Sequence, residues 1–172
     1  MKNFRFFLLL LLAIFLTVTG SAQNMFLKIK GIPGESKDEG HKDWINLLSF
    51  KQGVSAKVST AATRMAGRAN FNDFIFTKKM DKASPLLMEK CATGEMLPEV
   101  EMEITSADGR GFYTIRLNGV RITGVETSSN CIPQCVTMEE VSFNYSKITW
   151  EYTDAKEGKV KSGYDLMLNK KI

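Results

Sequence analysis

Apolar and polar residues alternate along most of the chain beyond residue 23, which is typical of β-strands that bury one face. In residues 25–29, for example, three apolar side chains lie on one side and the lysine lies on the other. The same period predicts strands at residues 100–104, 113–117, 120–125, 141–145, 148–152 and 164–168. Two apolar runs, 44–50 and 71–79, predict strands that are well buried. Alternation therefore predicts a mainly β fold around one core.

One helix and two connections interrupt the strands. Ser84 can cap the free amides of a helix, Pro85 suits its first turn and Gly94 ends it, which predicts a short helix packed on the sheets. Residues 31–43 are polar and rich in glycine, which predicts a long loop. Residues 107–111 are typical of a hairpin turn.

Two further stretches depart from simple alternation. Near Lys147 the pattern shifts by one residue, which indicates a bulge or a strand that bends between two packing surfaces. Gly158 is expected in a turn that precedes the last strand. Residues 52–70 are small, polar and basic and show neither period, so no element is predicted for them.

The first 22 residues have the three parts of a secretory signal peptide. Lys2 and Arg5 precede an apolar run of 13 residues, 6–18, and small residues lead to a cleavage site after Ala22. The run is well short of the roughly 20 residues that a spanning helix needs, so cleavage is favoured over a permanent anchor. Residues 23–172, which are 150 of the 172, then form a single mature domain that is secreted or periplasmic.

Charge and cysteine content add two expectations. Without Lys2 and Arg5, 21 of the 23 basic residues remain against 19 acids, a formal charge of +2 that indicates no nucleic-acid partner. Cys131 and Cys135 lie in a turn-rich segment of an exported chain, where a local disulfide is favoured over two free thiols. Cys91 is left unpaired and is interpreted as a small buried residue of the helix.

Candidate catalytic and metal-binding groups are few. His41 is the one histidine and lies in the polar loop, where it is interpreted as solvated, so no nucleophile-base pair can be assembled. One histidine and three cysteines give no zinc spacing, and the acids of the loop do not follow the calcium-loop pattern. The acids at 99, 101 and 103 are read as the wet face of a strand rather than a glycosidase pair. We expect no enzyme activity, no metal and no cofactor.

The order of short motifs resembles the haemolysin-coregulated protein (Hcp) family of type VI secretion tube subunits. The most specific block joins a strand, a helix start and a terminating glycine in the family's order. The matching motifs cover nearly all of the mature chain: MFLKI at 25–29, GIPGESKD at 31–38, GHKD at 40–43, LSF at 48–50, GVS at 53–55, FTKKMDKASP at 76–85, CATG at 91–94, EVSFNYSKI at 140–148 with Trp150, and GYDL at 163–166.

This resemblance implies a β-barrel of two packed antiparallel sheets with one short flanking helix. It also implies self-assembly into hexameric rings that can stack into a tube and carry small effector proteins in the lumen, without catalysis. A head-to-tail ring needs two different complementary surfaces on each subunit. The candidate subunit-interface residues are Gly34, Glu35, Ser36, Lys37, Asp38, His41, Asp43, Thr93, Gly94, Glu95, Glu99, Glu101 and Glu103.

The leader is a departure from the resemblance. Typical tube subunits have no cleavable signal, so either Met25 is the true start or an Hcp-like protein is exported separately, and the well-formed apolar run favours export. Two other functions stay open. The same barrel could serve as a monomeric periplasmic or extracellular binding module that uses exposed aromatics such as Trp44. A hydrolase is the least favoured, because no nucleophile-base pair is present.

Overall fold

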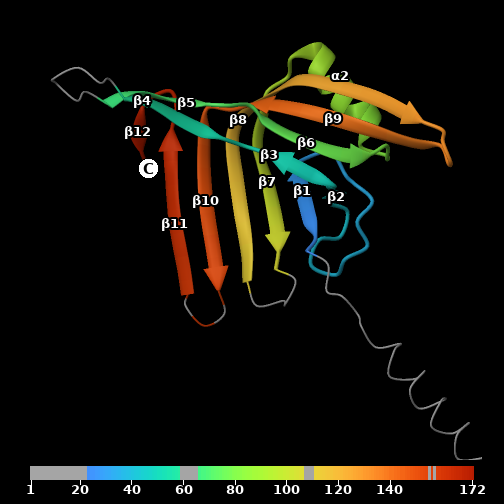
Figure 1. The fold of residues 1–172 in the computed structure, drawn as a ribbon, viewed down its shortest axis with the longest axis horizontal. Helices are drawn as coiled ribbons and strands as arrows, with labels where there is room; N and C mark the ends of the chain where they lie inside the picture. Colours follow the sequence, from blue (N-terminus) through green and yellow to red (C-terminus); the bar gives the residue numbers. More distant parts are fainter. Residues whose placement is uncertain (1–22, 59–65, 107–110, 155, 157) are drawn as a thin grey trace, which may run out of the picture.

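The structure is a computed structural model that describes residues 23–58, 66–106, 111–154, 156 and 158–172. Most of these residues form strands, with one short helix beside them (Figure 1). The elements are β1 Met25–Ile29, β2 Ile45–Asn46, β3 Ser49–Lys51, β4 Val54–Val58, β5 Ala66–Phe71, β6 Phe74–Lys79, α2 Ser84–Thr93, β7 Leu97–Thr105, β8 Gly111–Asn130, β9 Val136–Asn144, β10 Lys147–Asp154, β11 Gly158–Asp165 and β12 Lys170–Lys171.

Two antiparallel layers surround the core. The first layer, here sheet A, has the strand order β12-β11-β10-β8-β7-β1-β2, and the second, sheet B, has the order β3-β6-β9-β8. The strands of sheet B cross those of sheet A near the top of the view in Figure 1, and the lower parts of the sheet A strands extend beyond sheet B. The mainly β fold with two antiparallel sheets and one short helix is confirmed.

Strand β8 closes one corner of the barrel because it belongs to both sheets. Its first half pairs with β7 and β10, and from Arg121 to Asn130 it pairs with β9. The expectation of two strands, 113–117 and 120–125, is therefore wrong. Gly119 has φ 60 and a register shift follows at Ile122, so the strand bends and changes partners without a turn.

Residues 45–51 close the opposite corner. The amide of Leu47 donates to the carbonyl of Met25 in sheet A, at 2.9 Å, and the next amide, that of Leu48, donates to Thr77 in sheet B, at 2.8 Å. The expected single strand at 44–50 is thus two short strands, β2 and β3, in different sheets. Consecutive amides point to opposite sides of an extended chain, so one dipeptide can join both sheets.

The phase shift near Lys147 marks another passage between the sheets. Strand β9 ends at Asn144 within sheet B, and β10 begins at Lys147 within sheet A. Tyr145 and Ser146 form the bend, where Ser146 Oγ donates to the carbonyl of Asn118 at 2.9 Å. Of the two interpretations of the shift, a chain that bends between two packing surfaces is the one observed.

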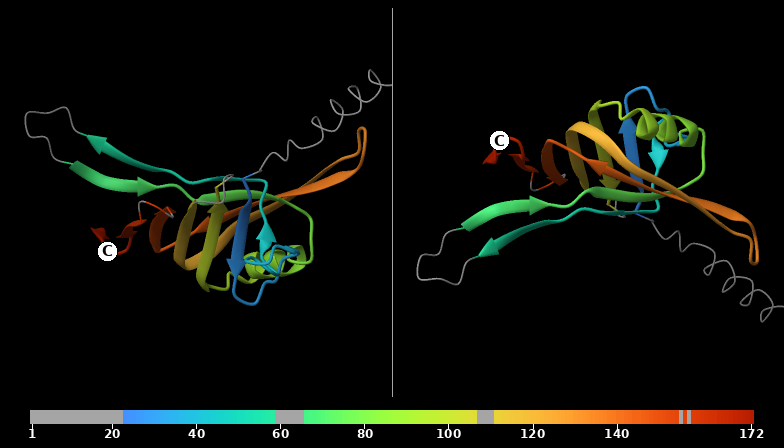
Figure 2. Two further views of the ribbon diagram at one scale, coloured as in Figure 1. Left: turned by 90° about the horizontal axis from the view of Figure 1, so that it is seen from below. Right: turned by 90° about the horizontal axis from the view of Figure 1, so that it is seen from above.

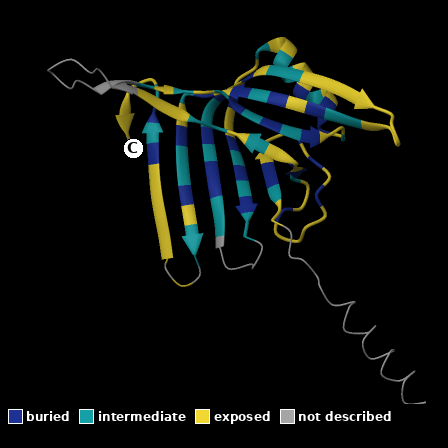
Figure 3. Ribbon diagram, viewed as in Figure 1, coloured by how far each residue is buried: buried dark blue, intermediate teal, exposed yellow. Residues whose placement is uncertain are grey.

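Phenylalanines from sheet B fill the centre of the core. Phe74, Phe76 and Phe143 are completely buried, and the rings of Phe76 and Phe143 meet edge to face with centroids 5.1 Å apart. The alternate residues of β1, β7 and β8 in sheet A cover them, and Figure 3 shows the resulting band of buried residues. Each fully buried side chain of this size contributes about 1.5–3 kcal/mol, so the alternation seen in the sequence specifies the core.

The unassigned stretch contains a two-stranded ribbon, β4 and β5, which projects past the barrel (Figure 2). Residues 59–65, between the two strands, lie outside the described part. Val54, Ser55 and Ala56 of β4 are exposed, so the ribbon has no buried face there that would require alternation. At its base Phe71 stacks near Trp150 of β10, with ring centroids 6.3 Å apart.

The helix ends as expected at Gly94, which has φ 65, but it does not begin as expected. Ala83 is its N-cap, with no side-chain cap, and the amide of Ala83 donates a hydrogen bond to the Asp81 carboxylate at 2.9 Å. Ser84 instead donates to the buried Glu139 at 2.7 Å. The expected Ser84 cap is therefore wrong, because a buried carboxylate uses that hydroxyl.

Four other expectations concern chain segments at the ends or turns. The predicted leader, 1–22, and the turn at 107–110 lie outside the described residues, although β7 and β8 do pair as antiparallel neighbours. The last strands are β11 and β12 rather than 164–168, and Gly158 begins β11 instead of lying before it. Over the described ranges, no helix has the length and apolar character needed to cross a bilayer.

Candidate assembly interface

The loop between β1 and β2, residues 31–43, folds back on itself through backbone hydrogen bonds beside β2. The amide of Gly34 donates to the carbonyl of Asp43 at 2.7 Å, and the amide of Ser36 donates to that of Trp44 at 2.9 Å. Gly34 is buried, and a Cβ there would overlap the backbone of the facing limb. The position requires glycine, because only a residue with no side chain allows the limbs to approach so closely.

His41 is buried in this loop, so the expectation of a solvated histidine is wrong. Its ring stacks on Phe26 with centroids 4.1 Å apart and meets the edge of Trp44 at 4.9 Å. Its Nδ1 lies 2.6 Å from a carboxylate oxygen of Asp38, and Nε2 lies 3.5 Å from one of Glu103. The hydrogen bond from His41 is the main cause that lowers the pKa of Asp38. Sequence spacing gave no sign of this, because only the sheet brings Phe26 and Glu103 to the loop.

Replacing His41 by alanine is expected to lower the free energy of unfolding by about 1–2 kcal/mol, since a stacked ring and its hydrogen bond are lost. Urea unfolding of the mature chain would measure the change. Lys42→Ala, at the exposed neighbouring position, is the control and is expected to be nearly neutral. An equal loss in both variants would show that His41 does not organise the loop.

The other loop candidates divide by burial. Gly34 and Ser36 are buried beside His41 and shape the loop, whereas the side chains that remain exposed are those of Glu35, Lys37, Asp38 and Asp43. Lys82, from the segment before α2, forms hydrogen bonds with two side chains of the loop. Its amide donates to Glu35 at 3.2 Å and its ammonium donates to Asp43 at 3.2 Å.

The candidates at the end of α2 form a separate surface. Thr93 caps its own helix by donating to the carbonyl of Glu89 at 2.9 Å, and Glu95 pairs with Lys90 at 2.6 Å. The carbonyl of Gly94 accepts a hydrogen bond from Arg121 of β8 at 2.6 Å. These contacts attach the helix end to the part of β8 that lies in sheet B, so the structure does not combine it with the loop.

The three glutamates of β7 lie on the outer face of sheet A, and two of them are less exposed to solvent than expected. Glu99 is exposed, whereas Glu101 and Glu103 are half-buried. Arg116 of β8 pairs with Glu101 at 2.7 Å and approaches Glu151 of β10 at 3.8 Å. Since Glu103 also contacts His41, the strand and the loop form one continuous polar surface.

This polar face continues to the edge strand β11. Lys159 donates to Glu151 at 2.7 Å, and that hydrogen bond is the main cause that lowers the pKa of Glu151. The row of charges therefore crosses β7, β8, β10 and β11 with alternating sign. Charges that pair within the subunit leave a polar face without a strong net field.

The two ends of sheet A carry exposed apolar side chains that the sequence patterns did not reveal. At the β12 end, the exposed fractions of Met167, Leu168 and Ile172 are 76%, 62% and 53%. At the β2 end, Leu48 and Met80 are 45% and 52% exposed beside the start of α2. Neither set alternates with polar residues, and the burial of a side chain in a connecting segment cannot be read from periodicity.

The sequence also led to expectations for the three cysteines and for Trp44. Cys131 and Cys135 form a disulfide at the exposed tip of the β8–β9 hairpin, as predicted, and Cys91 is a free, half-buried thiol packed on the core. Trp44 is half-buried, and the ammonium of Lys28 lies 5.3 Å from its ring centroid. The ring is therefore not an open aromatic platform for a ligand.

A family model described as "Type VI secretion system effector, Hcp" matches residues 26–152. The chain belongs to the Hcp family. The resemblance seen in the sequence motifs is thereby confirmed at the level of the family. Hcp proteins are structural, secreted proteins of type VI secretion systems, and no enzyme stands among the relatives named below. The predicted leader lies outside the matched residues.

Individual Hcp relatives agree with this assignment. The chain is 31% identical to a Pseudomonas aeruginosa protein described as "Protein hcp1", over 86% of this chain and 98% of the relative. It is 29% identical to the "Major exported protein" of the same organism, over 80% of this chain and 87% of the relative. A solved structure described as "Structure of a type six secretion system protein" superposes with a TM-score of 0.80 at 28% identity, over 88% of this chain and 100% of that chain.

Proposed function

We propose that this chain is an exported Hcp subunit that assembles head to tail into hexameric rings, which can stack and carry small effector proteins. The observation that carries the proposal is the difference between the two ends of sheet A. One end is the loop 31–43 beside β2, and the other is β12 with the turn before it. Two unlike surfaces on one subunit suit a heterologous contact, which closes into a ring when the rotation allows. The number six comes from the family resemblance.

Exposed sheet edges support assembly. Residues 158–162 of β11 are exposed at every position, because β12 and the residue after it pair with Gly163, Tyr164 and Asp165 at the other end of that strand. Unpaired edges invite pairing with another chain unless they are covered. Lysines on β11 protect such an edge from indiscriminate pairing, so a specific partner is favoured.

The outer face of sheet A supports the role of a lumen wall. Its side chains are polar, and its ion pairs are formed within the subunit, from Glu101 through Arg116 to Glu151. A wall with paired charges is wettable and exerts little attraction on a passing protein. Such a surface suits a conduit better than a tight binding site.

The predicted leader and the disulfide support export by a route that usual tube subunits do not need. The leader has the composition of a cleavable signal, and the disulfide of Cys131 persists only outside a reducing cytoplasm. We therefore propose that assembly takes place after secretion or in the periplasm.

The mass of the oxidised 23–172 form, measured by light scattering across a concentration series, tests the proposal. We expect six times the protomer mass at high concentration, with dissociation on dilution. The same sample in strong urea gives the protomer mass and serves as the control. A mass that stays at one protomer at every concentration would contradict assembly and favour a monomeric binding module.

A further inference from the structure

We propose that an apolar ridge at the β12 end of one subunit docks into a groove at the β2 end of the next copy. The ridge consists of Met167, Leu168 and Ile172. The groove is lined by Glu35, Asn46, Leu48, Lys79, Met80 and Asp81 and has a volume of about 350 Å³. The proposal rests on the proposed head-to-tail assembly and specifies which side chains make the contact.

The ridge is held in place within its own subunit. The Asp165 carboxylate accepts a hydrogen bond from the amide of Leu168 at 2.8 Å and pairs with Lys147 at 3.1 Å. The Leu168 amide is the main cause that lowers the pKa of Asp165, so the carboxylate keeps its charge, and the turn its shape, at neutral pH. The amide of Ile172 donates to the carbonyl of Gly163 at 3.1 Å. An ordered ridge loses little conformational entropy when it docks.

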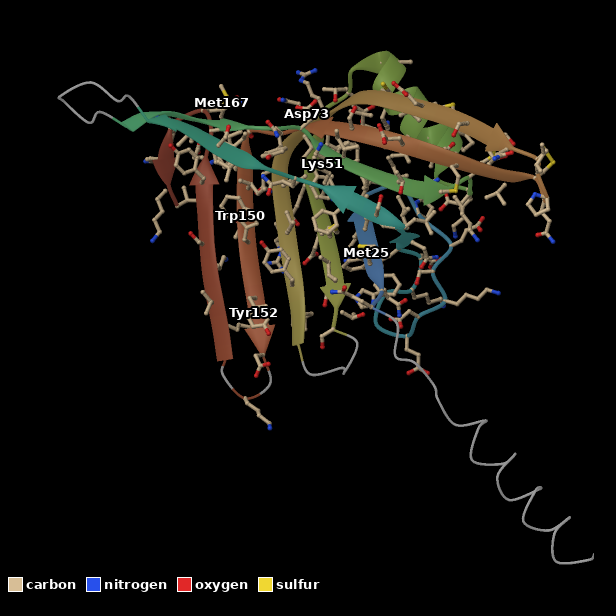
Figure 4. The ribbon with its side chains drawn as sticks, in the orientation of Figure 1. Met25, Lys51, Asp73, Trp150, Tyr152 and Met167 are labelled. Atoms are coloured by element: carbon tan, nitrogen blue, oxygen red, sulfur yellow. A yellow bond between two sulfur atoms is a disulfide. The ribbon has the colours of Figure 1, made fainter. Side chains whose placement is uncertain are left out.

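The exposure of this ridge is unusual for an ordered turn. Three large apolar side chains within six residues are each more than half exposed, and Figure 4 places Met167 at the margin of sheet A. Scattered exposed apolar residues are normal, but a cluster on a fixed turn marks a contact surface. Leu168 lies between the other two in the sequence, and its amide is fixed by Asp165, so it is the position chosen for the test.

The groove is equally well supported. The amide of Leu48 donates to Thr77 at 2.8 Å, and that of Met80 donates to Thr137 at 3.1 Å, so both backbones are part of the sheet B framework. Asp81 is held by the buried ammonium of Lys78 at 2.7 Å. The lining combines the apolar side chains of Leu48 and Met80 with polar and charged ones, namely Glu35, Asn46, Lys79 and Asp81.

The charges of the two ends differ. From residue 156 to 171 the sequence carries five lysines against one aspartate and one glutamate. Around the groove, residues 35–43 together with Asp81 carry five acids against four exposed lysines, Lys37, Lys42, Lys79 and Lys82. Two β12 ends would therefore repel each other, whereas a β12 end meets no such repulsion at the groove. This asymmetry, together with the position of the ridge at the β12 margin of sheet A and of the groove at the corner between β2 and β3, identifies the occupant as a second copy in head-to-tail orientation.

Paired cysteines test the contact in the mature chain. Leu168→Cys and Met80→Cys are introduced together in a Cys91→Ser background, with the native disulfide intact, and a short bis-maleimide reagent is added. We expect a ladder of covalent multimers on a denaturing gel, since each subunit then offers one thiol at each end. Each single variant is expected to give little product, because like ends do not meet. Leu168→Cys with Met96→Cys is the matched control, since Met96 is exposed to a similar degree, 55%.

A second variant measures the contribution of the ridge. Leu168→Asp is expected to raise the concentration of half-assembly at least about tenfold, as for a central interface residue, whereas Met96→Asp leaves it unchanged. A multimer by light scattering that gives no ladder would overturn the ridge-groove contact and leave ring assembly standing. A ladder of equal strength with Met96→Cys would also overturn it. A protein that stays monomeric throughout would overturn both proposals.

Discussion

Replacing Lys78 by methionine is expected to lower the free energy of unfolding by about 3–5 kcal/mol, because it leaves buried acids without their cation. The ammonium of Lys78 is fully buried and lies 2.7 Å from both Glu139 and Asp81. It also donates to Ser84 Oγ at 3.0 Å and to the carbonyl of Lys79 at 2.9 Å. Urea unfolding at a protein concentration too low for assembly would measure the loss.

Two further variants separate the charge from the packing. Lys79→Met removes an exposed neighbouring lysine and is expected to be nearly neutral. The double variant Lys78→Met, Glu139→Leu is expected to recover about half or more of the loss, since it removes the main uncompensated carboxylate. If Lys78→Met were no worse than Lys79→Met, the buried network would not be a determinant of stability.

The same network connects the core to the candidate interface. Asp81 and Ser84 place the start of α2, and Lys82 between them holds Glu35 and Asp43 of the loop. Lys78→Met should therefore weaken assembly more than its effect on overall stability alone would predict.

Gly34→Ala is expected to cost about 3 kcal/mol, at the upper end of the range for overpacking. The new Cβ would overlap the backbone of Trp44 and Ile45 in the facing limb, and a backbone cannot rotate away as a flexible side chain can. The limb would have to open and to lose the hydrogen bond between Gly34 and Asp43. Urea unfolding measures the stability, and light scattering measures any loss of assembly.

Gly40→Ala in the same loop is the matched control. Its nearest neighbour, a carboxylate oxygen of Asp38, would lie 3.5 Å from the new Cβ, which is an ordinary contact, and the residue is exposed. A change within about 0.5 kcal/mol is expected. If both alanines were tolerated equally, close approach at Gly34 would not explain the choice of glycine.

Local patterns predicted the strands that bury one face, because a half-buried strand must alternate. Strands β1, β7 and β10 were found on this basis, and the end of α2 was found because Gly94 takes the left-handed conformation. The β4–β5 ribbon was missed because it projects from the barrel and no alternation was required of it. Residues 44–50 were merged into one strand because apolar content alone does not show which sheet each amide joins.

Polar residues were the least predictable from the sequence. His41 looked like a solvated loop residue, and Ser84 looked like a helix cap, yet both are buried partners of distant carboxylates, Glu103 and Glu139. Lys78 follows Phe74 and Phe76 at every second position of β6, so it lies on the same buried face of the strand. This position was the one sign of its burial in the sequence. Its partners could not be inferred together, because Asp81 is close in sequence whereas Glu139 comes from the distant strand β9.

By itself the sequence determined a mainly β fold, its family and its local disulfide, and it led to the expectation of a leader followed by one mature domain, since each depends on residues close together in the chain. The tertiary structure decided which strands cross between the sheets, which charges meet in the core, and which apolar side chains remain exposed at the two ends of sheet A. These features depend on contacts between distant segments, and their free energies arise only when folding brings those segments together.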